Sequence, residues 1–237
     1  MIELYGCSSP NVLKVIVALE ELETPYRFRY VDVVMGEHFT PEFGKLNPNR
    51  RVPIIVDPEG PDGRLLTLWE SGAILIYLAE KAGALMPHDA TERCLALQWL
   101  MFQMGGIGPM FGQYVHFTRY AGDQTYSRAR YHTEVLRLYD VVETRLAEAP
   151  YLGGSEYSIA DIAAWSWLHS LEIDGVDRAD YAHMKRWLDE IAARPAVVRA
   201  REVRAGIKVH NMVALAQDAP EKLDRFFGRG QYSRAPA

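Results

Sequence analysis

The strand-like stretches of this sequence all lie before residue 87, and the chain after that point has only helical patterns. Short apolar runs bounded by turn residues occur in this first part at residues 2–5, 26–33, 52–57 and 65–68. Helical periodicity occurs in the same part at residues 11–22 and 70–82. The polar stretch before the third run is long for a loop and is expected to hold a short helix. This alternation predicts a small α/β domain, which we place at residues 1–83.

The second part of the chain is predicted to be an all-helical domain at residues 89–205. A linker at residues 81–88 precedes it, and helical runs follow at residues 91–104, 127–146, 158–171 and 181–193. Ser158 and Asp161 have the spacing of a capping box at the start of the third run. Residues 206–237 are expected to form a tail with a short helix near 214–227. The side chains expected in the core include Cys94, Trp165, Trp167 and Trp187.

Composition excludes several classes of protein. The 237 residues are 49% hydrophobic and 24% charged, which is typical of a globular protein with a substantial core. A net charge of −5 gives no electrostatic basis for binding nucleic acid, and no stretch is apolar for long enough to cross a membrane. The N-terminus lacks the pattern of a secretory signal, and two cysteines suit a reducing compartment. We therefore expect a cytoplasmic protein without nucleic-acid or membrane partners.

The start of the first helix is a candidate anion site. A strand runs into Cys7, Ser8 and Ser9, and Pro10 follows as a good first helical residue, with Ser9 as the predicted N-cap. Free backbone N–H groups and the positive end of the helix dipole meet there, which favours an anion such as a thiolate. The alternative is that Ser9 and Asn11 serve only to cap the helix.

Two further positions have more than one interpretation. Pro53 at the entry of a strand cannot donate to the sheet, so the Val52–Pro53 pair indicates either an edge with a special bend or an ordinary turn. Ser71 at a helix start offers a hydroxyl, an N–H and the dipole to a carboxylate, and Glu70 can accept from an ammonium group. The Glu70–Ser71 pair would serve equally well as a plain helix cap with an acidic first turn.

The order and spacing of four motifs resemble those of the glutathione transferase superfamily. The motifs are Ser8-Ser9-Pro10-Asn11 after a strand, Arg51-Val52-Pro53 before a strand, Glu70-Ser71-Gly72-Ala73-Ile74, and Ser158-Ile159-Ala160-Asp161-Ile162-Ala163. The sequence is most similar to the bacterial nu-class group, whose members act as glutathione-dependent disulfide-bond reductases. That likeness rests on Ser9-Pro10-Asn11, on Trp69, and on residues 97–100 and 105–113. The resemblance implies a thioredoxin-like N-terminal domain, an all-α C-terminal domain, and glutathione as co-substrate without a metal.

The resemblance also implies a place for each part of glutathione. Glu70 and Ser71 match the contacts of the γ-glutamyl end, and a cis Val52–Pro53 bond turns the backbone of Val52 toward the ligand. The glycyl carboxylate is expected near His38 and Arg51. The nu-class pattern tends to have an amide where His38 stands, so this contact is a departure that could depend on pH. A solvated surface position is the alternative for both His38 and Arg51.

The same resemblance assigns the chemistry to the ligand's own sulfur. Ser9 and Asn11 stand where nu-class proteins stabilise the glutathione thiolate, and we expect these residues to be catalytic. Ser8 is a competitor because other classes place their serine slightly earlier. Cys7 is a second competitor, because some classes form a mixed disulfide with glutathione through a cysteine in this loop.

A second ligand is expected between the domains, beside the glycine-rich segment 105–109, which we expect to break the helix begun at Thr91. Gln113 and Arg130 are its candidate contacts, since this cleft in the nu class accepts a second glutathione or glutathione disulfide. An ion pair on a helix surface is the alternative for Arg130.

We therefore expect a homodimeric, glutathione-dependent thiol-disulfide oxidoreductase that acts on small thiol and disulfide substrates. Conjugation of glutathione to electrophiles or peroxide reduction is the alternative, followed by a non-catalytic protein with the same fold.

Overall fold

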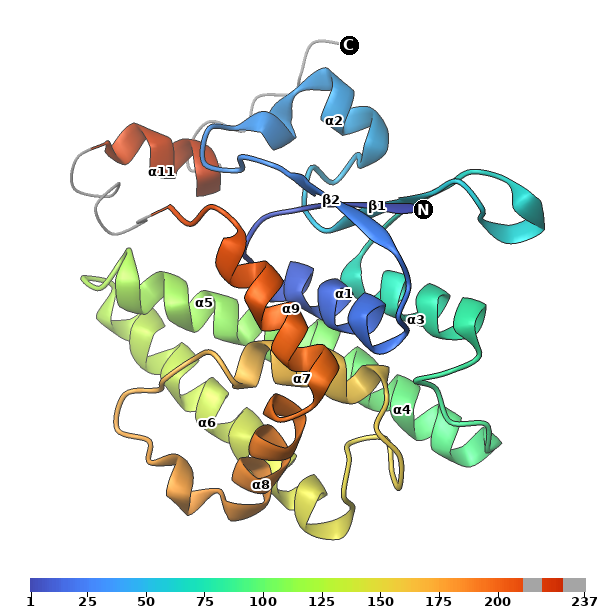
Figure 1. The fold of residues 1–237 in the computed structure, drawn as a ribbon. Helices are drawn as coiled ribbons and strands as arrows, with labels where there is room; N and C mark the ends of the chain where they lie inside the picture. The colour runs from blue at the N-terminus through green and yellow to red at the C-terminus, as the bar shows by residue number, and fades with distance from the viewer. Residues whose placement is uncertain (211–218, 228–237) are drawn as a thin grey trace.

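The structure, a computed structural model, describes residues 1–210 and 219–227 (Figure 1). A four-stranded sheet and its helices form the N-terminal part, and the C-terminal part is helical. In Figure 1, α2 (Pro41–Leu46) lies above the sheet, while α1 (Pro10–Glu21) and α3 (Ser71–Ala82) lie between the sheet and the helical part. The predicted fold class, a thioredoxin-like α/β domain followed by an all-α domain, is confirmed.

The sheet has the strand order β2-β1-β3-β4. Its strands are β1 (Ile2–Gly6), β2 (Tyr26–Tyr30), β3 (Ile54–Asp57) and β4 (Leu66–Trp69). β1 is parallel to β2, as a strand–helix–strand crossover requires, and antiparallel to β3, which pairs with β4 as a hairpin. Inward and outward residues alternate along β1, so the inward-facing Leu4 is fully buried between Phe28 and Ile55 of the neighbouring strands.

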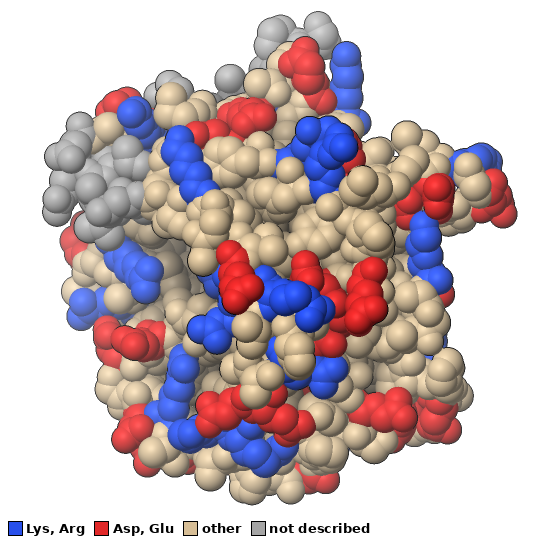
Figure 2. All heavy atoms as spheres, viewed as in Figure 1, with Lys and Arg blue, Asp and Glu red and all other residues tan. Residues whose placement is uncertain are grey.

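Helix α1 is the element that joins the two parts of the molecule. It packs against α3 in the N-terminal part and against α7 (Ile159–Leu168) and α9 (Pro195–Gly206) in the helical part. Because it is covered on several sides, every residue from 12 to 19 is buried, and the only charged residue in that run is Lys14. The α1–α9 contact carries the ion pairs Glu21–Arg194 and Glu20–Arg199. Acidic and basic side chains are likewise interspersed over the face shown in Figure 2.

The other helices of the described chain are α4 (Ala90–Phe102), α5 (Gly108–Arg119), α6 (Thr125–Glu148), α8 (Ala182–Ala192) and α11 (Pro220–Phe227). Short 3-10 helices lie at Glu37–Phe39, Pro61–Gly63 and Arg178–Asp180. The predicted capping box at Ser158 and Asp161 is present at the start of α7 and is fully buried. Asp161 also accepts hydrogen bonds from the Leu152 backbone and the Trp187 indole, so it holds two neighbouring segments against α7.

Several sequence expectations are corrected by the structure. The glycine-rich segment does not break the helix, because a π-helix at Gln103–Ile107 carries α4 continuously into α5. Cys94 is exposed on α4 rather than buried in the core. Trp165 and Trp187 are fully buried, but Trp167 is only half-buried and lines a cavity. The predicted tail helix is confirmed over Pro220–Phe227, whereas residues 214–218 lie outside the described residues.

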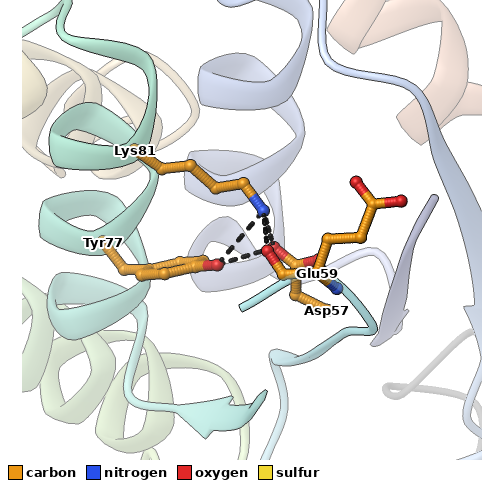
Figure 3. A network of polar contacts seen from close by, with 4 residues as sticks. All are labelled: Asp57, Glu59, Tyr77 and Lys81. Atoms are coloured by element: carbon orange, nitrogen blue, oxygen red, sulfur yellow. Dashed lines mark hydrogen bonds and ion pairs between the residues drawn. The ribbon is translucent and has the colours of Figure 1, made fainter. Parts of the chain in front are cut away.

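A buried carboxylate ties the end of β3 to α3 (Figure 3). The Asp57 side chain accepts hydrogen bonds from the Tyr77 hydroxyl at 2.6 Å and from the Lys81 ammonium group at 2.5 Å. Lys81 also donates to the backbone carbonyl of Glu59. Burial alone would raise the pKa of Asp57, but the bonds from Lys81 and Tyr77 outweigh it and hold that pKa below its usual value. The network fixes α3, whose N-terminus lies at the candidate site.

Candidate active site

A cavity of about 760 Å³ lies between the two parts of the molecule, at the N-terminal ends of α1 and α3. The predicted site residues that line it are Ser9, Asn11, His38, Arg51, Val52, Glu70 and Gln113, together with the competitor Cys7. Pro53 and Ser71 are buried beside their predicted neighbours in the chain. Residues from five separate sequence regions therefore meet at one place, as the sequence motifs required.

Asn11 has a fixed orientation in this cavity. Its side-chain oxygen accepts a hydrogen bond from the indole nitrogen of Trp167 at 2.9 Å. An indole N–H can only donate, so the oxygen of the amide must face Trp167 and the amide's NH₂ group must point away from it. In the part of the chain that the structure describes, no hydrogen-bond partner occupies that NH₂ group. Asn11 therefore has a donor available for an anion in the cavity.

Ser9 is the N-cap of α1, as predicted. Its hydroxyl oxygen accepts from the backbone N–H of Val12 at 3.3 Å, and Pro10 is the first residue of the helix. The cap does not use the hydroxyl hydrogen, which can donate to the Cys7 sulfur or, in its place, to an anion in the cavity. Capping and anion binding are therefore compatible functions of Ser9.

Cys7 and Ser8, the two competitors of Ser9 and Asn11, precede the cap of α1. Burial raises the pKa of the Cys7 thiol, and hydrogen bonds from Ser9 only partly oppose this effect. Cys7 is therefore held mainly as a thiol near neutral pH, which disfavours it as a nucleophile. Ser8 lines a second, adjoining cavity, and its carbonyl accepts a hydrogen bond from Arg204 on α9 at 3.1 Å.

The N-terminus of α3 has no side-chain cap. Glu70 precedes the helix with φ 73° and ψ 112°, a strained conformation for a residue with a side chain, and it makes no capping hydrogen bond. Its carboxylate lines the cavity and accepts a long hydrogen bond from Asn49 at 3.5 Å. Ser71 is the first helical residue rather than the cap. The interpretation of this pair as a plain helix cap is therefore wrong, and the free N–H groups of α3 are available to a ligand.

The two residues expected to bind the glycyl carboxylate, His38 and Arg51, differ in exposure. His38 is buried, and burial together with the charges of Arg51 and Arg50 lowers its pKa to about 4. Its ring is therefore neutral at physiological pH, which corrects the expectation that this contact depends on pH in that range. Arg51 is exposed at the rim, where its guanidinium donates to the Arg50 carbonyl at 3.1 Å and faces the cavity. The Val52–Pro53 bond is cis, as the resemblance implied, and Val52 lies outside the sheet ladder, which begins at Ile54.

Lys14 is a site residue that sequence reasoning missed. It lines the cavity from the middle of α1 with only 1% of its surface exposed. Its ammonium group donates to the Ser71 hydroxyl and to the side-chain oxygen of Gln103 on the π-helix. The sequence signal for Lys14 is a lysine in an otherwise apolar helical run. A buried charge without an ion pair costs free energy, so a lysine at such a position is a candidate functional residue.

The adjoining second cavity has a volume of about 570 Å³ and shares Cys7, Ser9 and Gly112 with the first. Its basic lining residues are His116, Arg119, Arg204, Lys208 and His210, and no Asp or Glu is among its described lining residues. Phe226 and Phe227 of α11 line both cavities, and Phe227 packs against the rings of His116 and Tyr120. The tail thus contributes an aromatic wall that sequence reasoning did not anticipate.

Arg130 does not reach either cavity in the described chain. It lies on α6 with 53% of its side chain exposed and pairs with Glu134 one helical turn away. The expected contact of Arg130 with a second ligand is therefore corrected to the surface ion pair that was its alternative. Gln113, the other expected contact, lines the first cavity from α5 and is not among the residues described around the second.

Comparison with known families defines the class of this protein. The model of the glutathione S-transferase N-terminal domain matches residues 8–81, and that of the glutathione S-transferase C-terminal domain matches residues 125–190. The chain belongs to the glutathione S-transferase family.

No helix among the described residues is both long and apolar enough to span a bilayer, and no cluster of metal ligands is found in the same part of the chain.

Individual relatives narrow the comparison. The chain is 47% identical over 203 residues to the disulfide-bond oxidoreductase YfcG of Escherichia coli, covering 84% of this chain and 94% of that protein. A glutathione transferase family member from Pseudomonas fluorescens, solved with two glutathione molecules bound, matches with a TM-score of 0.79 and 41% identity over 84% of this chain and 91% of that one. A glutathione transferase from Pseudomonas putida, solved with one glutathione disulfide per subunit, matches with a TM-score of 0.79 and 40% identity, covering 85% and 91%.

Proposed function

We propose that this protein is a glutathione-dependent disulfide-bond reductase. The observation that carries the proposal is the hydrogen bond from Trp167 to Asn11, because it leaves the amide NH₂ of Asn11 as a donor at the N-terminus of α1. A thiolate bound there would receive hydrogen bonds from Asn11 and Ser9 and the favourable field of the helix dipole. The similarity to YfcG, a protein named as a disulfide-bond oxidoreductase, supports the same activity.

Glutathione would lie along the first cavity with one part at each predicted position. Its γ-glutamyl carboxylate is assigned to Ser71 and the uncapped N-terminus of α3, and its ammonium group to Glu70. The backbone of Val52 pairs with the cysteinyl residue, and His38 and Arg51 donate to the glycyl carboxylate. The solved relatives from Pseudomonas, which contain glutathione or its disulfide, support this choice of ligand.

The reaction needs only the sulfur chemistry of the ligand. The bound glutathione thiolate attacks one sulfur of a disulfide RSSR, forms a mixed disulfide GSSR, and releases RS⁻, which takes up a proton. A second glutathione then attacks the mixed disulfide and releases the other thiol as RSH. The sum is two glutathione molecules and one disulfide converted into glutathione disulfide and two RSH. We assign the acceptor to the second cavity, which adjoins Ser9.

Dimerisation, location and domain limits are part of the same proposal. We propose a homodimer, on the basis of the family likeness, and a cytoplasmic location, on the basis of the two cysteines and the need for reduced glutathione. We keep the proposed division into residues 1–83, 89–205 and a tail at 206–237.

Conjugation of glutathione to an electrophile or reduction of a peroxide could use the same thiolate, so acceptor preference decides between the activities. We expect turnover of hydroxyethyl disulfide to exceed turnover of an aryl halide. Glu70→Ala is expected to weaken binding to immobilised glutathione. If the native protein does not bind immobilised glutathione and Glu70→Ala behaves identically, every enzymatic version of the proposal is wrong. Faster turnover of the aryl halide or a peroxide would reassign the protein to conjugation or peroxide reduction.

A further inference from the structure

Lys14 is a buried cation that forms no ion pair with a carboxylate of the described chain. Its ammonium group donates to the Ser71 hydroxyl at 3.2 Å, the Gln103 side-chain oxygen at 2.7 Å and the Met104 sulfur at 3.4 Å. All three acceptors are uncharged, and none of the ion pairs found among the described residues includes Lys14. Burying an ammonium group without a counter-ion is costly, so an anion that arrives nearby would be favoured.

The surroundings of Lys14 show where such an anion would sit. Ser71 Oγ accepts from Lys14, which leaves the Ser71 hydroxyl hydrogen free to turn; in the structure it points to the Met104 sulfur, a weak acceptor, at 3.6 Å. The backbone N–H groups at the start of α3 lie next to this hydroxyl and have no side-chain cap. A hydroxyl donor, uncapped N–H groups and a buried positive charge thus surround one position, which suits a carboxylate.

We propose that Lys14 is a positioning residue that acts as the buried counter-charge for the ligand carboxylate at Ser71, orienting the Ser71 hydroxyl toward it. The inference rests on the proposed function, since that carboxylate is the γ-glutamyl carboxylate of glutathione. Lys14 also holds Gln103, whose own NH₂ group is buried without a hydrogen-bond partner in the described chain. A side chain at Gly108 would lie 3.1 Å from that nitrogen, so the glycine leaves room for this arrangement. The same lysine therefore connects the ligand site to the helical domain.

The charge of Lys14 is coupled to occupancy of the site. Burial lowers the pKa of Lys14 to about 7, and the nearby Glu70 carboxylate opposes this shift only in part. A ligand carboxylate would favour the charged ammonium form and raise the pKa again. Above about pH 7, binding should therefore take up a proton, and affinity should fall by up to about tenfold per pH unit.

Other charged groups, on the elements that pack against α1, have to be distinguished from Lys14 as causes of a pH-dependent affinity. Glu70, directly before α3, is the charged residue that acts on Lys14 from that side, and the π-helix contributes the uncharged Gln103 and Met104. Helix α7 carries Asp161, which is held in its capping box, and is followed at its C-cap by His169, whose pKa is lowered to about 4 mainly by burial.

The remaining charged residues lie on α9 or around the two cavities. On α9, Arg199 pairs with Glu20, Arg204 binds the Ser8 carbonyl, and Arg201 and Glu202 are exposed. Around the cavities, the basic residues are His38, Arg50, Arg51, His116, Arg119, Lys208 and His210. Because these residues include histidines, a Lys14 variant is needed to assign any proton that is taken up.

The test is calorimetric binding of S-methylglutathione, whose blocked sulfur does not titrate, between about pH 6 and about pH 8 in two buffers of different ionisation heat. The native protein is expected to take up a fraction of a proton near pH 7.5 and to bind roughly tenfold more weakly at the higher pH. Lys14→Met is expected to bind at least about tenfold more weakly at low pH, with no proton uptake and little pH dependence. Lys185→Met removes an exposed lysine that pairs with Asp189 on α8, and should behave like the native protein.

The outcomes separate the two proposals. Binding by the native protein without proton uptake, or unchanged uptake and affinity in Lys14→Met, would overturn the role of Lys14 and leave the proposed function standing. Absence of any S-methylglutathione binding by the native protein would overturn the proposed function, and this inference with it. The proton-uptake measurement uses the native protein, so an absence of uptake overturns the role of Lys14 even where Lys14→Met fails to fold.

Discussion

The indole nitrogen of Trp167 in the helical domain donates to the side-chain oxygen of Asn11 at the first turn of α1, with 2.9 Å between the two atoms. This bond crosses the domain boundary and decides which end of the Asn11 amide faces the cavity. The helical domain thus contributes to the proposed glutathione site of the other domain through a residue that itself lines the same cavity.

Trp167→Phe should lower activity with little loss of stability. Phenylalanine keeps most of the ring but cannot donate, so the Asn11 amide is free to rotate its oxygen toward the thiolate. We expect kcat/KM for hydroxyethyl disulfide to fall about tenfold, equivalent to about 1.4 kcal/mol, the order of one lost hydrogen bond. Trp99→Phe is the matched control, because Trp99 on α4 is half-buried and does not line the cavity. Equal losses in both variants would contradict the role of the Trp167–Asn11 bond.

Cys7→Ala should retain disulfide reduction within about twofold of the native rate. Burial raises the pKa of the Cys7 thiol, so little of it is the reactive thiolate near neutral pH. Steady-state kinetics with glutathione and hydroxyethyl disulfide check this prediction. A loss of activity in Cys7→Ala that Asn11→Ala does not share would instead make Cys7 the nucleophile.

Asp57→Asn should destabilise the N-terminal domain by about 2 kcal/mol, because the amide is a weaker partner for Tyr77 and the Lys81 ammonium group. The folded pKa of Asp57 is lowered, so its stabilising contribution is present above the ordinary carboxyl pKa and is lost as pH falls through the folded value. Urea unfolding near neutral pH measures the loss. We expect the difference in the free energy of unfolding between the native protein and Asp57→Asn to become smaller in acid. A difference that does not depend on pH would contradict the negative charge assigned to Asp57.

The protein should lose stability as pH falls from about 6.5 to about 4, in part through His169. Its ring stacks on Trp165 with centroids 3.9 Å apart, and burial, opposed by the contact with the Trp165 carbonyl, lowers its pKa to about 4. In this range the unfolded chain binds a proton that the folded protein does not, so stability declines with decreasing pH. His169→Gln should reduce that decline by about 1–2 kcal/mol, measured by unfolding at each pH. An unchanged pH dependence would show that His169 does not titrate in this way.

The parts of this structure that could be predicted from sequence are those with a local signal. Strand–turn–helix boundaries, the Ser9 cap and the Ser158–Asp161 capping box depend on neighbouring residues, and all three are present. The motif order placed Asn11, Glu70 and Val52 correctly at one cavity, because the turns of this fold converge there.

The rest depends on contacts between distant segments, which no local pattern encodes. The partner of Asn11 is 156 positions away, so Trp167 could not be distinguished from the core residue Trp165 on the same helix. The glycines near residue 105 suggested a break, but the continuous π-helix is fixed by tertiary packing, including the bond from Lys14 to Gln103. Arg130 was placed from the resemblance alone, and Glu134 four residues later was the local signal for its observed ion pair.

The most direct test of the central claim is the pKa of glutathione bound to the native protein and to Asn11→Ala, measured from the ultraviolet absorbance of the thiolate during a pH titration. The account predicts a bound thiol pKa below that of free glutathione in the native protein, and a rise of about one unit in Asn11→Ala, the effect of one lost hydrogen bond to the thiolate. An identical bound pKa in the two proteins, or a native value no lower than that of free glutathione, would contradict the claim that Asn11 stabilises the thiolate.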